Sequence, residues 1–173
     1  MSDQRWSYIG VGTNLGDRAA NLRGALRLLQ ERLAPTSLEI SNVYATAPRM
    51  DLDQATFLNA VIRLRLDVAP LDLLRQTQAI EAQMGRVKDP TRPKGPRIID
   101  LDLLSVGRRI LNTPELELPH PGIALRLFVL RPWADLAPEW SHPVTGETIA
   151  QMLAKTPDLG EIALWASSQE FDR

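Results

Sequence analysis

The chain has 173 residues, of which 44% are hydrophobic and 24% are charged, values typical of a single globular domain, so we expect neither disorder nor a second domain. Its 20 Lys and Arg residues nearly balance 21 Asp and Glu residues, which argues against a broad basic surface for nucleic acid. The lack of cysteine excludes disulfides and a thiol nucleophile, and the absence of a signal-peptide layout or a long apolar run predicts a cytoplasmic protein without a membrane partner.

The N-terminal part of the chain predicts a strand, a helix and a second strand. Residues 6–12 are apolar and lead into a turn. Leucines then recur at helical spacing over residues 22–33, and this helix ends before Pro35. Residues 37–44 read as the second strand, and residues 46–56 as a loop long enough to suggest a functional role.

The middle of the chain combines regular elements with a basic loop. Residues 57–66 alternate between apolar and charged side chains, as in a half-exposed strand. A helical stripe runs from Pro70 to Gly85, where proline suits a first turn and glycine suits a stop. Residues 86–97 hold three prolines and five cationic side chains, so we expect a stiff basic loop there.

The C-terminal part predicts fewer elements. Residues 98–106 form an apolar strand, with residues 109–111 as its hairpin partner. Residues 148–155 predict a short helix, and residues 156–173 a surface tail behind a core of about residues 6–155. The mixture of strands and helices predicts one α+β domain, with helices packed on a mainly antiparallel sheet.

Two carboxylates on one strand form the strongest chemical signal. Side chains alternate along a strand, so Asp100 and Asp102 share a face, roughly 7 Å apart at the backbone, while Ile99, Leu101 and Leu103 take the other face. Such a pair requires cationic partners or a hard cation such as Mg²⁺. The alternative is the solvated face of an edge strand.

The basic loop that precedes this strand points to phosphate. Arg86, Lys88, Arg92, Lys94 and Arg97 together with a metal would neutralise a polyphosphate during phosphoryl transfer. No glycine-rich phosphate loop is present. The alternative is a solvated loop whose cations pair with surface acids.

Other candidates have weaker support. Gln78 and Glu81 share a helical face that either lines a nucleotide pocket or is merely exposed. His120, between two prolines, is either a phosphate donor or structural. Phe57 and Phe128, with the Asn59 amide, suit a flat heterocycle, although both rings are equally compatible with the core.

Taken together, these segments resemble the hydroxymethyldihydropterin pyrophosphokinase family of folate biosynthesis. The Gly95-Pro96-Arg97-x-x-Asp100-x-Asp102 run with a downstream Pro-His is the most specific part. The resemblance extends, in the family's order, over residues 8–16, 44–48, 53–59, 81–86, 95–104, 119–121 and 126–128.

The resemblance implies a ferredoxin-like fold, ATP as co-substrate and a reaction that moves its pyrophosphoryl group onto the pterin hydroxymethyl group. It also implies small-molecule substrates and a monomer. The implied roles are metal binding of two Mg²⁺ ions by Asp100 and Asp102; catalysis by these two with Arg86 and Arg97; nucleotide binding by Gln78, Glu81, Arg86, Lys88, Arg97, His120 and Arg126; and pterin binding by Thr46, Pro48, Phe57, Asn59 and Phe128. The loops 46–56 and 86–95 would close over the site.

The sequence departs from the family pattern at three positions. Lys94 stands where tryptophan is usual, Lys88 where arginine is frequent, and Ala55 where proline is common. Competing hypotheses are an RNA-binding ferredoxin-like module, which the aromatic content of only 5% disfavours, a metal-dependent phosphohydrolase or nucleotidyltransferase, and a family member that binds pterin without reacting.

Overall fold

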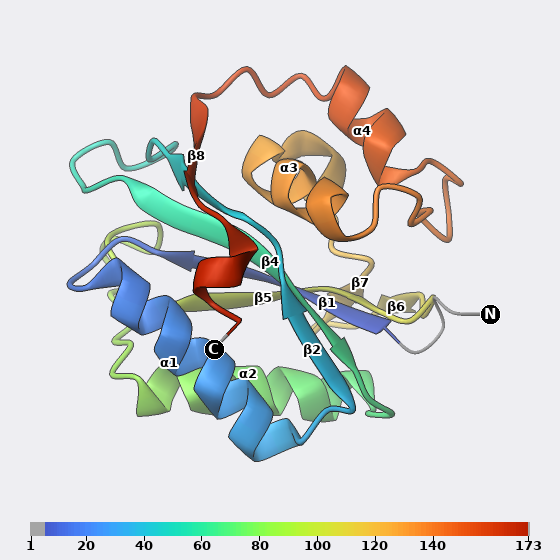
Figure 1. The fold of residues 1–173 in the computed structure, drawn as a ribbon, viewed down its shortest axis with the longest axis horizontal. Helices are drawn as coiled ribbons and strands as arrows, with labels where there is room; N and C mark the ends of the chain where they lie inside the picture. The colour runs from blue at the N-terminus through green and yellow to red at the C-terminus, as the bar shows by residue number, and fades with distance from the viewer. Residues whose placement is uncertain (1–5, 173) are drawn as a thin grey trace.

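The fold is built on a six-stranded antiparallel sheet (Figure 1). The computed structural model describes residues 6–172. The strands run in the order β5-β1-β4-β3-β8, with β2 also paired to β4. Their bounds are β1 (Trp6–Thr13), β2 (Ser37–Ile40), β3 (Val43–Thr46), β4 (Phe57–Arg65), β5 (Asp100–Val106) and β8 (Ile162–Ala166). A separate small ribbon pairs β6 (Leu111–Asn112) with β7 (Glu117–Leu118).

Helices cover both faces of the sheet. The helices α1 (Arg18–Leu33) and α2 (Pro70–Gln83) lie on one face, and α3 (Leu127–Leu136) and α4 (Ile149–Lys155) lie on the other (Figure 1). Two short 3₁₀ helices, η2 (Ile123–Leu125) and η3 (Ser168–Glu170), complete the fold. The strand order and the two crossover helices α1 and α2 confirm the expected ferredoxin-like α+β class.

Two apolar clusters stabilise these layers. Leu22, Leu29, Leu73 and Ile80 project from α1 and α2 onto the first face of the sheet. On the second face, Tyr8 of β1 packs against Trp133 of α3, and Trp133 packs against Trp140. Burial of apolar side chains on both faces is the main term that holds a layered domain together.

The helix ends follow local rules. The Asp17 carboxylate accepts a hydrogen bond from the Ala20 N–H, so α1 begins four residues before its leucine stripe. It ends at Ala34, whose φ of 43° is left-handed, and Pro35 follows. Pro70 opens α2, where a missing N–H costs nothing. Both helices therefore match their expected positions closely.

Two predicted strand assignments are wrong. The expected strand over residues 37–44 is two strands, because Ser41 turns inward and its Oγ accepts the Val61 N–H in place of a regular ladder contact. Residues 109–111 do not pair with β5; Leu111 pairs with Leu118 instead.

The surface tail predicted for the last residues is also wrong. β8 extends the sheet by pairing with β3, and Phe171 packs into the core. The alternation that marks a half-buried strand is weak here because Leu164 and Trp165 are both exposed.

Candidate active site

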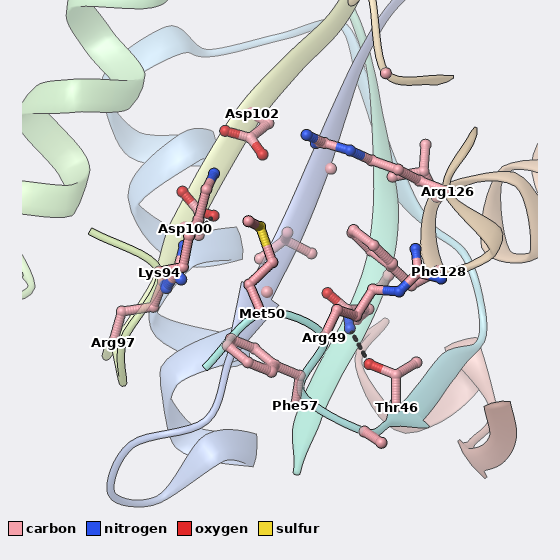
Figure 2. Close-up of a pocket in the computed structure, with 18 of the residues that line it drawn as sticks. Thr46, Arg49, Met50, Phe57, Lys94, Arg97, Asp100, Asp102, Arg126 and Phe128 are labelled. Atoms are coloured by element: carbon pink, nitrogen blue, oxygen red, sulfur yellow. Dashed lines mark hydrogen bonds and ion pairs between the residues drawn. The ribbon is translucent and has the colours of Figure 1, made fainter. Parts of the chain in front are cut away.

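A cavity of about 470 Å³ lies on the face of the sheet that carries α3. Figure 2 shows side chains converging on it from β5, β4, the end of β3, the η2–α3 junction and two loops. Eight predicted site residues line it: Thr46, Phe57, Asn59, Arg97, Asp100, Asp102, Arg126 and Phe128. The sheet therefore gathers carboxylates, cations and aromatic rings that are far apart in the sequence.

Two glycines of β1 form the floor of this cavity. Gly12 lies between Asp100 of β5 and Asn59 of β4, and Gly10 lies beside Asp102. A Cβ atom on Gly12 would come within 2.8 Å of the Asn59 amide oxygen. The lack of a side chain on the central strand thus leaves the open space between the acidic and amide sides of the cavity.

Asp100 is held by two arginines. One carboxylate oxygen accepts from Arg86 Nη1 at 2.8 Å and the other from Arg97 Nη1 at 3.1 Å. Arg86 also donates to Glu81 at 2.7 Å, and the same Glu81 oxygen accepts the Leu101 N–H at 2.7 Å. Glu81 therefore anchors the start of β5 and orients the arginine that contacts Asp100.

Asp102 has a different environment. It is half-buried, and neither a hydrogen bond nor an ion pair links its carboxylate to another described residue. Burial, reinforced by the negative charge of Asp100, raises the pKa of Asp102 to about 6, although Arg126 opposes this rise. An ionised Asp102 is therefore an unsatisfied anion that a cation in the cavity would stabilise.

The carboxylate pair suits a hard divalent cation that takes some of its oxygen ligands from the protein and the others from a bound substrate. Mg²⁺ binds through one or two carboxylates and completes its octahedron with waters and phosphate oxygens. Among residues 6–172, no cluster of three acidic or histidine side chains is placed to hold a metal by itself. Asp100 and Asp102 would therefore hold the ion only together with oxygens from a bound phosphate.

Arg126 faces the carboxylates from the opposite wall (Figure 2). No carboxylate of the described residues forms an ion pair with its guanidinium. It lies 5.9 Å from the centroid of the Phe128 ring. A cavity cation that has no carboxylate partner among residues 6–172 is available for an anionic ligand.

His120 is a neutral donor near this cation. Burial, with the charges of Arg126 and Lys94, lowers the pKa of His120 to about 4. Its Nδ1 accepts the Gly122 N–H at 2.9 Å, so the neutral ring carries its proton on Nε2. The imidazole can thus donate one hydrogen bond to a ligand oxygen.

The other half of the cavity suits a flat, weakly polar ring. Phe57 and Phe128 lie on its walls (Figure 2). Between them, the buried Asn59 amide donates to Thr46 Oγ1 at 2.6 Å. Aromatic faces with a fixed amide and hydroxyl provide both stacking and edge recognition for a heterocycle.

Two loops at the cavity mouth are linked to each other. Gln54 donates to the Lys94 carbonyl at 2.9 Å, and Arg92 forms an ion pair with Asp51. The buried Asn14 contacts both loops, since it donates to Gln54 and accepts the Arg97 N–H at 2.9 Å. The loops are thus fastened to the end of β1 and to one another.

Some predicted residues lie outside the cavity lining. Gln78 and Lys88 are exposed, while Glu81 and Arg86 stand behind Asp100. His120 is half-buried and also lies outside the lining, beside the lining residue Gly122. Pro48 lines a smaller neighbouring pocket. Sequence reasoning missed Gly10, Gly12, Arg49, Met50 and Gln54 as lining residues; two glycines at alternate positions of a central strand were the available signal for the floor.

The fold and cavity define a ferredoxin-like α+β domain whose cavity brings together carboxylates, cations and aromatic rings. The family model described as 7,8-dihydro-6-hydroxymethylpterin-pyrophosphokinase matches residues 8–138. The chain belongs to this family, which confirms the resemblance seen in its sequence.

Similar curated proteins support the assignment. The chain is 41% identical over 151 residues to a 2-amino-4-hydroxy-6-hydroxymethyldihydropteridine pyrophosphokinase of Pseudomonas aeruginosa, covering 87% of this chain and 91% of that protein. It is 38% identical over 161 residues to the folic acid synthesis protein fol1 of Schizosaccharomyces pombe, covering 93% of this chain. The chain spans only 22% of that fungal protein's length.

Solved structures show the same fold. The Plasmodium falciparum HPPK-DHPS wild type with pteroate superposes with a TM-score of 0.68 at 15% identity, covering 86% of this chain and 44% of that one. Within residues 6–172, no helix has the length and apolar character needed to cross a bilayer.

Proposed function

We propose that this chain transfers the pyrophosphoryl group of ATP to the hydroxymethyl group of 6-hydroxymethyl-7,8-dihydropterin, a step of folate biosynthesis. The hydroxyl oxygen attacks the β-phosphorus, the bond from that phosphorus to the α,β-bridging oxygen breaks, and AMP leaves with that oxygen. The hydroxyl proton is released, and the second product is the dihydropterin diphosphate. The supporting observation is Asp102, which has no hydrogen-bond or ion-pair partner within residues 6–172 and lies beside Asp100 in one cavity with Phe57 and Phe128.

The acidic side of the cavity would hold two Mg²⁺ ions. When bound, such ions neutralise phosphate charge and favour ionisation of the attacking hydroxyl. Asp100 and Asp102 are the protein ligands in this proposal, and Arg86 and Arg97 orient Asp100 through their ion pairs. The carboxylates thus locate the reacting phosphate next to the sheet floor.

The cationic groups would position the triphosphate. Arg97 and Arg126 approach from opposite walls, and His120 offers its Nε2 proton. Arg86 stands behind Asp100, to which it donates at 2.8 Å, and would act on the phosphates through that carboxylate. We assign Gln78, Glu81 and Lys88 to the nucleotide's outer border, with Glu81 acting mainly through Arg86.

The aromatic side would bind the pterin. Phe57 and Phe128 stack on its faces, while Thr46 and Asn59 contact its polar edge, with Pro48 behind them. The stacked ring would present its hydroxymethyl arm toward the carboxylates across Gly12. Holding the pterin hydroxyl close to the ATP phosphate and correctly oriented would provide most of the rate enhancement expected for such a transfer.

The linked loops would exclude water. Because hydrolysis competes with transfer, a closed cavity mouth favours the pterin hydroxyl as the acceptor. The contacts of Gln54 with Lys94 and of Arg92 with Asp51 hold both loops together. In this chain these two contacts would close the cavity mouth, where the family more often has an aromatic residue in place of Lys94.

The test is the identity of the released nucleotide. ATP and Mg²⁺ are incubated with and without the dihydropterin, and chromatography separates AMP, ADP and pyrophosphate. Pterin-dependent AMP without free pyrophosphate supports the proposal. Pterin-independent turnover would favour the phosphohydrolase alternative, and no turnover with retained pterin binding would favour a non-reacting family member.

A further inference from the structure

A buried carboxylate in the C-terminal segment joins three parts of the chain. The Asp158 side chain is only 2% exposed. It forms an ion pair with Arg49 of the loop after β3, accepts the Leu127 N–H at 2.7 Å, and accepts the Gly160 N–H at 2.8 Å. Each partner comes from a different segment, so Asp158 fixes their relative positions.

The contact with Leu127 bears on a ring of the cavity. Leu127 is the first residue of α3, and Phe128 follows it. The residue before the helix, Arg126, provides no side-chain cap. The Asp158 carboxylate satisfies an N–H that would otherwise lack a partner, and its charge suits a helix N-terminus. It therefore fixes the first turn of α3, which carries Phe128.

The contact with Arg49 bears on the same ring. The Arg49 guanidinium lies 5.7 Å from the centroid of Phe128, and both side chains line the cavity (Figure 2). The Arg49 side chain is partly exposed, at 40% of its surface, unlike its buried partner Asp158. Without its carboxylate partner, this long side chain would have no fixed place above Phe128.

The same segment also fixes the amide edge of the cavity. Beyond Gly160 the chain enters β8, where Ile162 pairs with Thr46. Thr46 Oγ1 is the acceptor of the Asn59 amide. Residues 158–162 thus support the aromatic wall and the polar edge, and neither Asp100 nor Asp102 depends on them.

We infer that Asp158 is a positioning residue for the pterin, acting through Arg49 and the start of α3. This inference rests on the proposed function, because it assigns the Phe128 side of the cavity to the pterin. It predicts that loss of the Asp158 charge weakens pterin binding selectively and leaves ATP binding intact.

The experiment compares Asp158→Asn, Arg49→Met and the double variant with the wild type. The asparagine keeps the size and one acceptor but loses the charge, and the methionine keeps the length of the arginine stem. Binding of 6-hydroxymethylpterin is followed by its fluorescence, and binding of a non-hydrolysable ATP analogue with Mg²⁺ is followed by calorimetry. KM for each substrate and the thermal midpoint are measured alongside.

We expect Asp158→Asn to weaken pterin binding and raise the pterin KM about tenfold, with ATP-analogue affinity within about twofold of the wild type. The pterin affinity of the double variant should be about that of the more affected single variant, because both substitutions break the same Asp158–Arg49 ion pair. Glu39→Gln is the matched control, since it breaks the Glu39–Arg63 ion pair away from the cavity.

Three results would overturn the inference. Equal losses for pterin and ATP would mean that Asp158 only stabilises the fold. Multiplicative losses in the double variant would mean that it does not act through Arg49. If the wild type forms pterin-dependent AMP, normal pterin binding by Asp158→Asn would refute the inference alone. A wild type that forms no such AMP would refute the proposed function as well as the inference.

Discussion

Asp102 shares a strand face with Asp100, yet the two arginines of this region both pair with Asp100. Arg86 and Arg97 each contact one oxygen of Asp100, at 2.8 and 3.1 Å. Asp102, one step further along β5, has no such partner among the described residues. The asymmetry leaves Asp100 oriented by two arginines and Asp102 with a carboxylate that a cation would stabilise, and Mg²⁺ binds proteins through one or two carboxylates together with waters and phosphate oxygens.

Replacing Asp102 should separate activity from stability. Asp102→Asn removes a proposed metal ligand, so we expect pterin-dependent AMP formation to fall by at least about a thousandfold. In metal-free buffer at pH 7.5 the same variant should be more stable than the wild type, on the order of 2 kcal/mol, because it removes an anion that burial disfavours. Kinetics and chemical denaturation measure the two effects.

The stability gain should depend on pH. Burial and the charge of Asp100 raise the pKa of Asp102 to about 6, from 3.8 for an unperturbed aspartate. The wild type therefore loses stability as pH rises from about 4 through 6, and the variant does not. Denaturation at pH 4 should show no advantage for Asp102→Asn. An advantage that is equal at pH 4 and pH 7.5 would contradict the electrostatic explanation.

Activity should fall as pH decreases through the same region. A protonated Asp102 cannot bind Mg²⁺, so metal affinity should decline below about pH 6 and metal binding should release protons there. The groups that face this carboxyl are Asp100 and Glu81, which raise its pKa, and Arg126 and Arg86, which lower it. Calorimetry of Mg²⁺ with an ATP analogue in two buffers of different ionisation enthalpy counts the protons.

Glu81 should act on the rate more than on ATP affinity. Its carboxylate holds the Leu101 N–H and Arg86, so Glu81→Gln keeps an acceptor but loses the ion pair that orients Arg86. We expect kcat to fall about tenfold with KM for ATP changed less than about threefold. A large rise in KM for ATP with unchanged kcat would instead support direct contact with the nucleotide.

Gly12 should tolerate no side chain. In Gly12→Ala the new methyl group would meet the Asn59 oxygen at 2.8 Å and displace the amide that contacts Thr46. We expect pterin affinity to fall about tenfold or more. Gly24→Ala, in the middle of α1, is the control for a glycine substitution outside the cavity; an equal effect of both variants would refute the local explanation.

Phe128 should contribute to pterin binding more than to ATP binding. Phe128→Ala removes one aromatic wall, and we expect a loss of about tenfold to a hundredfold in pterin affinity. Fluorescence titration of the pterin and calorimetry of an ATP analogue provide the comparison. Equal losses of affinity for both ligands would mean that the Phe128 ring does not stack on the pterin.

Local sequence patterns predicted the elements that carry most of the site. Asp100 and Asp102 follow from strand alternation, and the helices from leucine spacing and proline positions. The segment 156–173 could not be read in this way, because β8 exposes both Leu164 and Trp165, and Asp158 gains its partners only through tertiary contacts. The break at Ser41 likewise depends on a bond to Val61, twenty residues away in sequence.

In the proposed reaction a pyrophosphoryl group moves intact from ATP to the pterin. The most direct measurement uses ATP radiolabelled at the β-phosphorus, with Mg²⁺ and the dihydropterin, followed by separation of the products. Intact transfer should carry the label from ATP into the pterin product, while AMP accumulates unlabelled in equal amount. Label found in ADP or in free pyrophosphate would contradict it.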